Sequence, residues 1–160
     1  FKRSCTMVSH ILLPTDGSQL SLEATNAGIE MAKVHSAAVT IYHALEPFPV
    51  WFHSGSPQIR PDWMQRLEEE QLAAGERFAE EAKRLAERLG VQVAAEVDRP
   101  NSPADGIVDA AKRLGCDMIF MASHGRAGIE RLLLGSVTQK VLVRSTVSVL
   151  VYRGAQTPTT

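Results

Sequence analysis

Short apolar runs alternate with helix-like segments along nearly the whole chain, and this alternation leaves few folds open. Strands are expected at residues 8–13, 37–45, 91–97, 117–121 and 147–152, and helices at 18–35, 63–89, 103–114 and 136–144. Strands separated by helices pair in parallel through right-handed crossovers. The pattern therefore predicts an α/β fold: a doubly wound, five-stranded parallel sheet with helices on both faces, Rossmann-like, and with the last strand at its edge.

Composition points to one globular domain. The chain has 160 residues, 44% of them hydrophobic and 22% charged, and a net charge of −1. This balance favours neither a nucleic-acid surface nor a membrane. We expect a single domain over residues 7–153, a leader or cloning remnant at 1–6, and a flexible tail at 154–160. Two cysteines, Cys5 and Cys116, make no disulfide framework, so a reduced, cytoplasmic setting is expected.

Two glycine corners flank the segment that follows the fourth expected strand. The apolar run 118–121 leads into Ala122-Ser123-His124-Gly125, and Gly135-Ser136 opens a helix nine residues later. Ser136 is expected to be the N-cap of that helix. A helix N-terminus preceded by glycine offers free N–H groups and a partial positive charge, which suit a phosphate. The two corners are expected to hold a polyphosphate between them.

The ends of three expected strands converge on these corners. Pro14 and Asp16 follow the first strand, and Ala44 lies at the end of the second. In doubly wound sheets, ligands bind at the carboxyl ends of the strands, where the strand order reverses. Asp16 has two interpretations that remain open: a ligand to the nucleotide or to a Mg²⁺ ion carried by its phosphates, or an Asx turn or N-cap that opens the first helix.

The glycine spacing resembles the signature of the universal stress protein family, G-x-x-G-x9-G-[S/T]. Gly125, Gly135 and Ser136 match it, whereas Ala122 replaces the first glycine and adds a methyl near the expected ribose or phosphate. The resemblance extends over residues 7–153. It implies the fold described above, ATP or alternatively AMP in the crevice, Mg²⁺ as an accompanying ion, and a homodimer formed through Val147–Tyr152.

The resemblance also implies a set of nucleotide-binding residues. These are Pro14, Thr15, Asp16, Ala44, Met121, Ala122, His124, Gly125, Arg126, Gly135, Ser136, Val137 and Thr138. By this resemblance, the phosphates bind at the glycine corners and the helix start, where Thr138 adds a hydroxyl. The adenosine binds at the ends of the first, second and fourth strands. For Ala44 and Met121 the backbone is expected to face the ligand, because their side chains suit core packing.

Other candidate residues have plainer interpretations. His43 is expected to be a hydrogen-bonded core histidine, and Arg131 an exposed charge. The aromatic residues Trp51, Phe52 and Trp63 are expected to form a hydrophobic plug beneath the long segment 45–62. A cover for the base and a surface for a partner protein are the alternatives.

The function expected is that of a nucleotide-responsive stress or regulatory module that acts on an unknown protein partner and binds neither nucleic acid nor membrane. One alternative is a slow ATPase or autophosphorylating enzyme using Asp16, His124 or a hydroxyl. It lacks support because no activated nucleophile or paired base is recognisable, and no catalytic residue is assigned. A second alternative is a dimeric interaction module without nucleotide, which Ala122 favours.

Overall fold

The structure is a computed structural model that describes residues 8–46, 62–125 and 134–154. Its elements follow the expected order, and every boundary lies within two residues of the expected one. They are β1 (His10–Pro14), α1 (Gln19–His35), β2 (Ala38–Ala44), α2 (Asp62–Arg88), β3 (Val93–Asp98), α3 (Pro103–Arg113), β4 (Met118–Ala122), α4 (Ser136–Arg144) and β5 (Ser148–Tyr152). The expected leader, residues 155–160 of the tail and most of the segment 45–62 lie outside the described residues.

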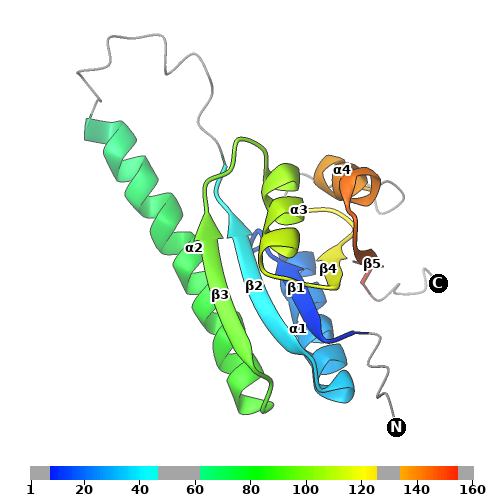
Figure 1. Cartoon of the computed structure of the whole chain (residues 1–160). Coiled ribbons are helices and arrows are strands. Elements are labelled where there is room, and N and C mark those ends of the chain that lie inside the picture. The colour runs from blue at the N-terminus through cyan, green and yellow to red at the C-terminus, as the bar shows by residue number, and fades with distance from the viewer. Residues whose placement is uncertain (1–7, 47–61, 126–133, 155–160) are drawn as a thin grey trace, which may run out of the picture.

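The strands form one parallel sheet in the order β3-β2-β1-β4-β5. Helices α1 and α2 cover one face, and α3 and α4 cover the other (Figure 1). This arrangement confirms the predicted doubly wound α/β fold. From β1 the chain adds β2 and then β3 on one side of β1. It then crosses back to add β4 and β5 on the other side of β1. The strand order therefore reverses between β1 and β4, where such folds bind their ligands.

Alternate residues of each central strand supply two separate core layers. Leu13 and Phe120 belong to the layer under α1 and α2, whereas Leu12 and Ile119 belong to the layer under α3 and α4. Side chains that point to opposite faces along a strand require both faces to be covered, so these strands appear as continuous apolar runs. At the carboxyl end of β2, Tyr42 is fully buried in the α3 layer, and its hydroxyl donates to Asp98 at 3.3 Å.

Helix α2 packs on the sheet through smaller residues than its pattern suggests. Leu67 is a large apolar side chain of this helix, but it is 37% exposed. The buried positions of α2 are Met64, Gly75, Ala79, Ala82 and Ala86. Small residues let the helix backbone approach the strands closely. The side of α2 that contacts the sheet therefore differs from the side that carries the large apolar residues such as Leu67.

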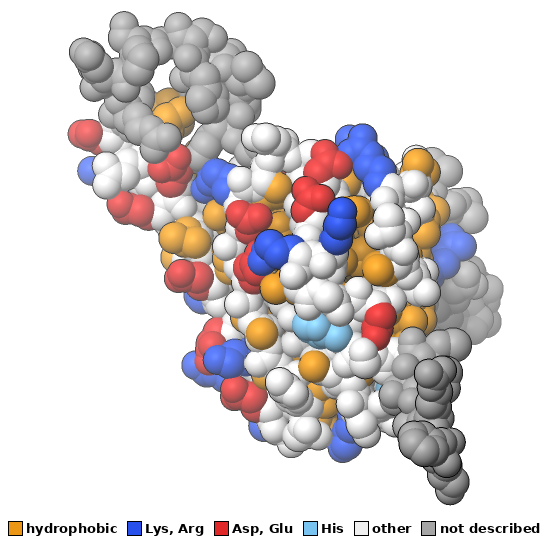
Figure 2. Space-filling model, viewed as in Figure 1, with side chains coloured by type: hydrophobic (Ala, Val, Ile, Leu, Met, Phe, Trp, Pro, Cys, Tyr) orange, Lys and Arg blue, Asp and Glu red, His pale blue; other side chains and the backbone are white. Residues whose placement is uncertain are grey.

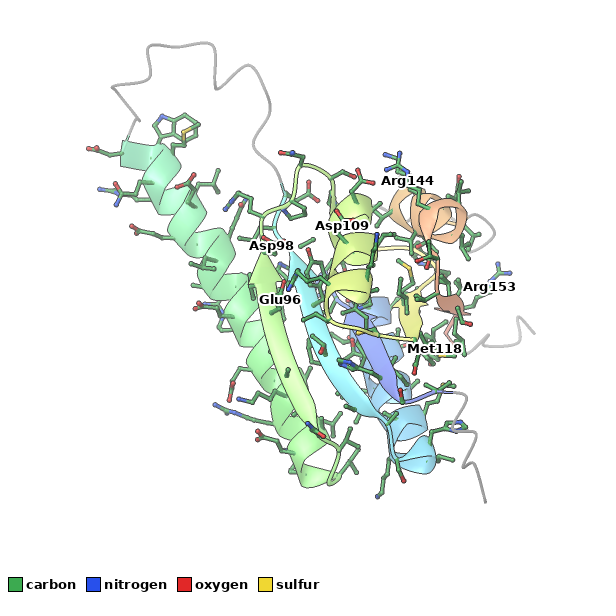
Figure 3. The ribbon with its side chains drawn as sticks, viewed as in Figure 1. Glu96, Asp98, Asp109, Met118, Arg144 and Arg153 are labelled. Atoms are coloured by element: carbon green, nitrogen blue, oxygen red, sulfur yellow. The ribbon has the colours of Figure 1, made fainter. Side chains whose placement is uncertain are left out.

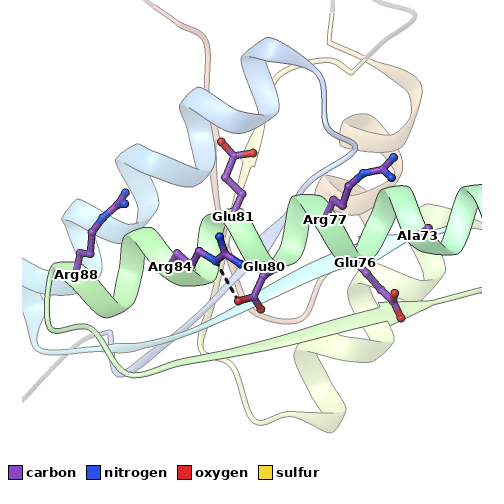
Figure 4. Close-up of a pocket in the computed structure, with 7 residues that line it drawn as sticks. All are labelled: Ala73, Glu76, Arg77, Glu80, Glu81, Arg84 and Arg88. Carbon is purple, nitrogen blue, oxygen red and sulfur yellow. Dashed lines mark hydrogen bonds and ion pairs between the residues drawn. The ribbon is translucent and has the colours of Figure 1, made fainter.

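The opposite side of α2 carries charged residues. Figure 4 shows a shallow hollow along this surface, lined by Ala73, Glu76, Arg77, Glu80, Glu81, Arg84 and Arg88. Arg84 lies 3.3 Å from Glu80 in an i,i+4 ion pair. Exposed pairs of this kind contribute little stability, and the two signs alternate, so this is a solvated helix face.

Ion pairs link α3 to the edge strand β3 and α4 to α3. Arg113 of α3 bonds Glu96 of β3, and Arg144 of α4 bonds Asp105 of α3 (Figure 3 labels Glu96 and Arg144). On the face seen in Figure 2, acidic and basic side chains are interspersed and form no patch of one sign. None of the described helices has the length and apolar character needed to cross a bilayer.

Candidate nucleotide site

A cavity of about 630 Å³ opens at the carboxyl ends of β1, β2 and β4. Its floor lies at the strand-order reversal, and α1, α2, α3 and α4 all contribute residues to its walls. This volume lies within the range of small-molecule sites, roughly 300–1,000 Å³. The position of the cavity is the one predicted for the ligand crevice.

The turn after β1 places Asp16 at the mouth of this cavity. The Ser18 N–H donates to Asp16 Oδ1 at 3.0 Å, which forms an Asx turn. Ser18, and not Asp16, is the N-cap of α1, because the Ser18 side chain accepts from the Ser21 N–H at 3.3 Å. Gly17 lies between them at φ +76°, which a side chain would strain. Of the two structural interpretations of Asp16, the Asx turn is therefore confirmed and the N-cap is wrong.

The two motif glycines are needed for close approach and not for a left-handed backbone. A Cβ on Gly125 would overlap the Asp16 carboxylate, so glycine lets the β4 corner lie against the β1 turn without displacing that side chain. A Cβ on Gly135 would lie 3.1 Å from the His124 Cα. Gly135 itself has φ −62° and is the N-cap residue of α4. The expectation that Ser136 is the N-cap is wrong, because Ser136 is the first helical residue.

Two hydrogen bonds attach the start of α4 to the end of β4. The Gly135 N–H donates to the Ser123 carbonyl at 2.8 Å, and the Thr138 hydroxyl donates to the Ala122 carbonyl at 3.0 Å. Thr138 is 2% exposed, and its hydroxyl proton is already engaged. What this helix start offers a ligand is therefore the N–H groups of residues 136–138, which have no partner within the helix.

Most of the surface of Ala122 is enclosed by protein. Ala122 is 7% exposed and belongs to the core layer under α1 and α2. Although the residue lines the cavity, most of its surface contacts protein. Replacement of the first motif glycine by alanine is thus accommodated by packing.

The end of β2 presents an open peptide group to the cavity. The Tyr42 carbonyl accepts from Thr15 N–H on the β1 side at 2.9 Å, and the Leu45 N–H donates to Asp98 on the β3 side at 2.7 Å. Because peptide groups alternate sides along a parallel strand, those of Ala44 point toward the β1 side. There β1 has already ended at Pro14, and no backbone bond joins Ala44 to Thr15 within the described chain.

The described charged residues of the cavity wall are acidic. Asp16, Glu46 and Glu70 line it, and no lysine or arginine is found among its described lining residues. Arg99 lies behind the wall, where its guanidinium donates to the Glu46 carbonyl at 3.0 Å and to Gln71 at 3.1 Å. The positive end of the α4 dipole is therefore the main described attraction for an anion in this cavity.

The described part of the site offers little for covalent chemistry. The Ser123 hydroxyl lies 3.1 Å from His124 Nδ1, but Ser123 is 3% exposed. Burial raises the pKa of the Cys116 thiol to about 11, so it is protonated at neutral pH, and Cys116 does not line the cavity. No group of three metal-ligating side chains is present in the described ranges.

The structure brings almost all of the predicted site residues together. Twelve line the cavity: Pro14, Thr15, Asp16, Ala44, Met121, Ala122, His124, Gly125, Gly135, Ser136, Val137 and Thr138. Arg126 and Arg131 lie outside the described residues, as do Trp51 and Phe52. Trp63 is 51% exposed, and the expected core role of His43 is confirmed, since it is 5% exposed and bonded to the Thr15 carbonyl.

Sequence reasoning missed roughly half of the cavity wall. The additional lining residues are Ser21, Tyr42, His43, Leu45, Glu46, Leu67, Glu70, Gln71, Ala74, Pro103 and Ile107. The residues at the end of β2 could have been predicted in the same way as Ala44, because they lie at the carboxyl end of the same strand. The contributions of α2 and α3 depend on how these helices cross the sheet, which no local pattern encodes.

The family model of the universal stress proteins matches residues 7–153. The chain belongs to the universal stress protein family. Among curated relatives, universal stress protein MJ0531 of Methanocaldococcus jannaschii is 34% identical over 145 residues, covering 89% of this chain and 81% of that protein. Universal stress protein YxiE of Bacillus subtilis is 32% identical over 149 residues, covering 92% and 100%.

Solved structures of this universal stress protein fold are also similar. MJ0577 of Methanocaldococcus jannaschii superposes with a TM-score of 0.76 at 25% identity, covering 94% of this chain and 99% of that one. A universal stress protein in complex with cAMP has a TM-score of 0.62 at 23% identity, covering 91% and 96%. An Arabidopsis thaliana member with AMP bound has a TM-score of 0.64 at 15% identity, covering 89% and 90%.

Proposed function

We propose that this universal stress protein binds an adenosine nucleotide in the cavity at the β1–β4 reversal and acts as a nucleotide-responsive regulatory module. One observation carries the proposal: the N-terminus of α4 and the open peptide group of Ala44 line the same cavity. The helix start suits a phosphate. The Ala44 peptide supplies one donor and one acceptor, which complements the paired donor and acceptor of an adenine edge.

The ligands of similar structures support an adenosine monophosphate as the minimal occupant. Proteins of this fold are solved with cAMP, with AMP and, for a member from Archaeoglobus fulgidus, with dAMP.

We propose Mg²⁺ as the ion that accompanies ATP when ATP is the ligand. Its additional phosphates would lie near Asp16 at the mouth of the cavity. A single carboxylate together with phosphate oxygens is a common way to hold Mg²⁺, so Asp16 fits this ion as an accompanying ligand. Mg²⁺ would neutralise the phosphate charge there, and ATP is expected to bind more weakly without it.

Proline at position 136 tests where the phosphate binds. Proline is well tolerated at the first position of a helix, and Gly135 already has the extended ψ of 153° that a following proline requires. Ser136→Pro thus deletes one N–H while α4 remains folded, whereas Ser136→Ala deletes only the hydroxyl. We expect the proline variant to bind AMP about tenfold more weakly and adenosine unchanged, by calorimetric titration.

Comparison of the two variants separates the N–H group from the hydroxyl, and thermal unfolding verifies that both remain folded. If Ser136→Pro weakens adenosine as much as AMP, the phosphate does not lie at α4. If the folded, ligand-free parent binds none of adenosine, AMP, cAMP or Mg²⁺-ATP, the nucleotide proposal fails, and the chain is then better explained as an interaction module.

We also propose that β5 forms a homodimer interface. β5 is an edge strand, and Val143 of the adjacent α4 is 86% exposed. The Tyr152 carbonyl bonds Ser123 N–H on the β4 side at 2.8 Å, so the peptide groups of Val151 point outward from the sheet. An apolar edge with outward-facing peptide groups pairs readily with a second copy.

Sedimentation velocity tests the dimer. The parent is expected to sediment as a dimer and Val151→Pro as a monomer, because proline removes an outward N–H without disturbing the β4–β5 ladder. Val151→Ala keeps that N–H and is expected to remain dimeric. A parent that is monomeric at tens of micromolar would remove the basis for this interface.

A further inference from the structure

His43 occupies a special place at the end of the β1–β2 ladder. Its side chain is 5% exposed, and its Nδ1 lies 2.7 Å from the Thr15 carbonyl oxygen. A carbonyl oxygen only accepts hydrogen bonds, so Nδ1 carries the proton in this contact. The imidazole of β2 therefore donates to the first residue beyond β1.

This contact replaces a bond that the sheet would otherwise make. The β1–β2 register pairs Pro14 with Tyr42, and the last ladder bond runs from Thr15 N–H to the Tyr42 carbonyl at 2.9 Å. Continued by one step, the parallel pattern would join the Ala44 N–H to the Thr15 carbonyl. That oxygen accepts from His43 instead, and Ala44 lines the cavity without this backbone bond.

The imidazole is held in this orientation by α2. A Cβ on Gly75 would lie 2.6 Å from His43 Cδ2, so the helix approaches the ring as closely as only glycine permits. Phe78 lies beside it, with ring centroids 5.9 Å apart. The Phe78 ring also lies so close to Gly17 that a Cβ there would overlap it. Gly75 and Phe78 of α2 thus pack against both His43 and the turn that carries Asp16.

From these contacts we infer that His43 is a positioning residue of the ligand site: it ends the β1–β2 ladder one step early and so leaves the Ala44 peptide open to read the ligand. The ligand in this inference rests on the proposed nucleotide function. The early end of the β1–β2 ladder does not depend on that function. His43 acts through Thr15 and Ala44, and it requires no change of protonation to do so.

Substitutions at His43 separate the donor from the packing. The amide nitrogen of asparagine is as many bonds from Cβ as Nδ1 is, so His43→Asn retains a donor for Thr15. His43→Leu removes the donor, and His43→Gln moves it one bond further out. As a matched control, His10→Leu removes the 2.9 Å contact of another histidine with Thr40, at the opposite end of the same strand pair.

Two measurements follow. In the ligand-free parent, the Ala44 amide is expected to exchange its hydrogen at least tenfold faster than in His43→Leu, where the freed Thr15 carbonyl accepts it. In titrations, His43→Leu and His43→Gln are expected to bind adenosine and AMP about tenfold more weakly than the parent, by equal factors. His43→Asn and His10→Leu are expected to remain within about threefold of the parent.

The outcomes are distinguishable. Nucleotide binding by the parent that His43→Leu leaves unchanged overturns the inference while the proposed function stands. Failure of the parent to bind any adenosine ligand removes the proposed function, but the amide exchange of Ala44 still tests the early end of the ladder. If His43→Leu does not fold, the comparison of His43→Gln with His43→Asn decides, and equal affinities in that pair overturn the inference.

Discussion

Replacing Leu13 with alanine is expected to lower the free energy of unfolding by about 3 kcal/mol, within the range of buried leucine truncations. Leu13 lies on the central strand and is 0% exposed. It packs against α1 so closely that a Cβ on Gly28 would overlap its Cδ2. The surrounding strands are paired on both sides, so they have little freedom to collapse into the space left behind.

Equilibrium unfolding in urea measures this loss, with the dependence on denaturant expected to stay unchanged. Leu72→Ala is the matched control, because Leu72 is 42% exposed on α2 and its truncation is expected to cost less than about 1 kcal/mol. Equal losses for the two variants would contradict the assignment of Leu13 to a tightly packed core.

Gly75→Val is expected to destabilise the fold by about 3 kcal/mol through overpacking and to weaken adenosine binding. The first added carbon would lie 2.6 Å from His43 Cδ2 and 3.2 Å from Val97 Cγ1, so the helix must shift away from the sheet. Helix propensity predicts the opposite sign, since valine is a better helix former than glycine. A loss of stability therefore reports packing against His43 and β3.

Ala73→Val is the control for this variant. Ala73 lies two residues away on the solvated face of α2, in the hollow of Figure 4. It is expected to change stability by no more than about 0.5 kcal/mol and to leave adenosine affinity as in the parent. A Gly75→Val protein as stable as Ala73→Val would show that α2 does not approach the sheet at this point.

The candidate site could be predicted in part from the sequence, because its main parts are local. Gly125 and Gly135 are separated by a fixed spacing, and each follows or precedes an element that a short pattern predicts. The reason why glycine is needed at these two positions could not be predicted from the sequence. Neither adopts a left-handed backbone, and the need for glycine at 125 arises from Asp16, more than a hundred residues away in sequence.

The exposed position of Leu67 illustrates a second limit. Periodicity counts large apolar side chains, but the buried side of α2 is built from Gly75, Ala79 and their small neighbours. How closely a helix approaches a sheet depends on both partners, so the sequence of one helix underdetermines which of its faces is buried.

By itself, the sequence determined the order and type of the nine described elements, the parallel doubly wound sheet and the family, because alternating periodicity and turn residues act over short distances. Only the tertiary structure decided which peptide groups remain open. The His43 bond to Thr15, the engaged Thr138 hydroxyl and the walls supplied by α2 and α3 all join residues distant along the chain. Such contacts follow from strand register and helix placement, which the packing of the whole core sets.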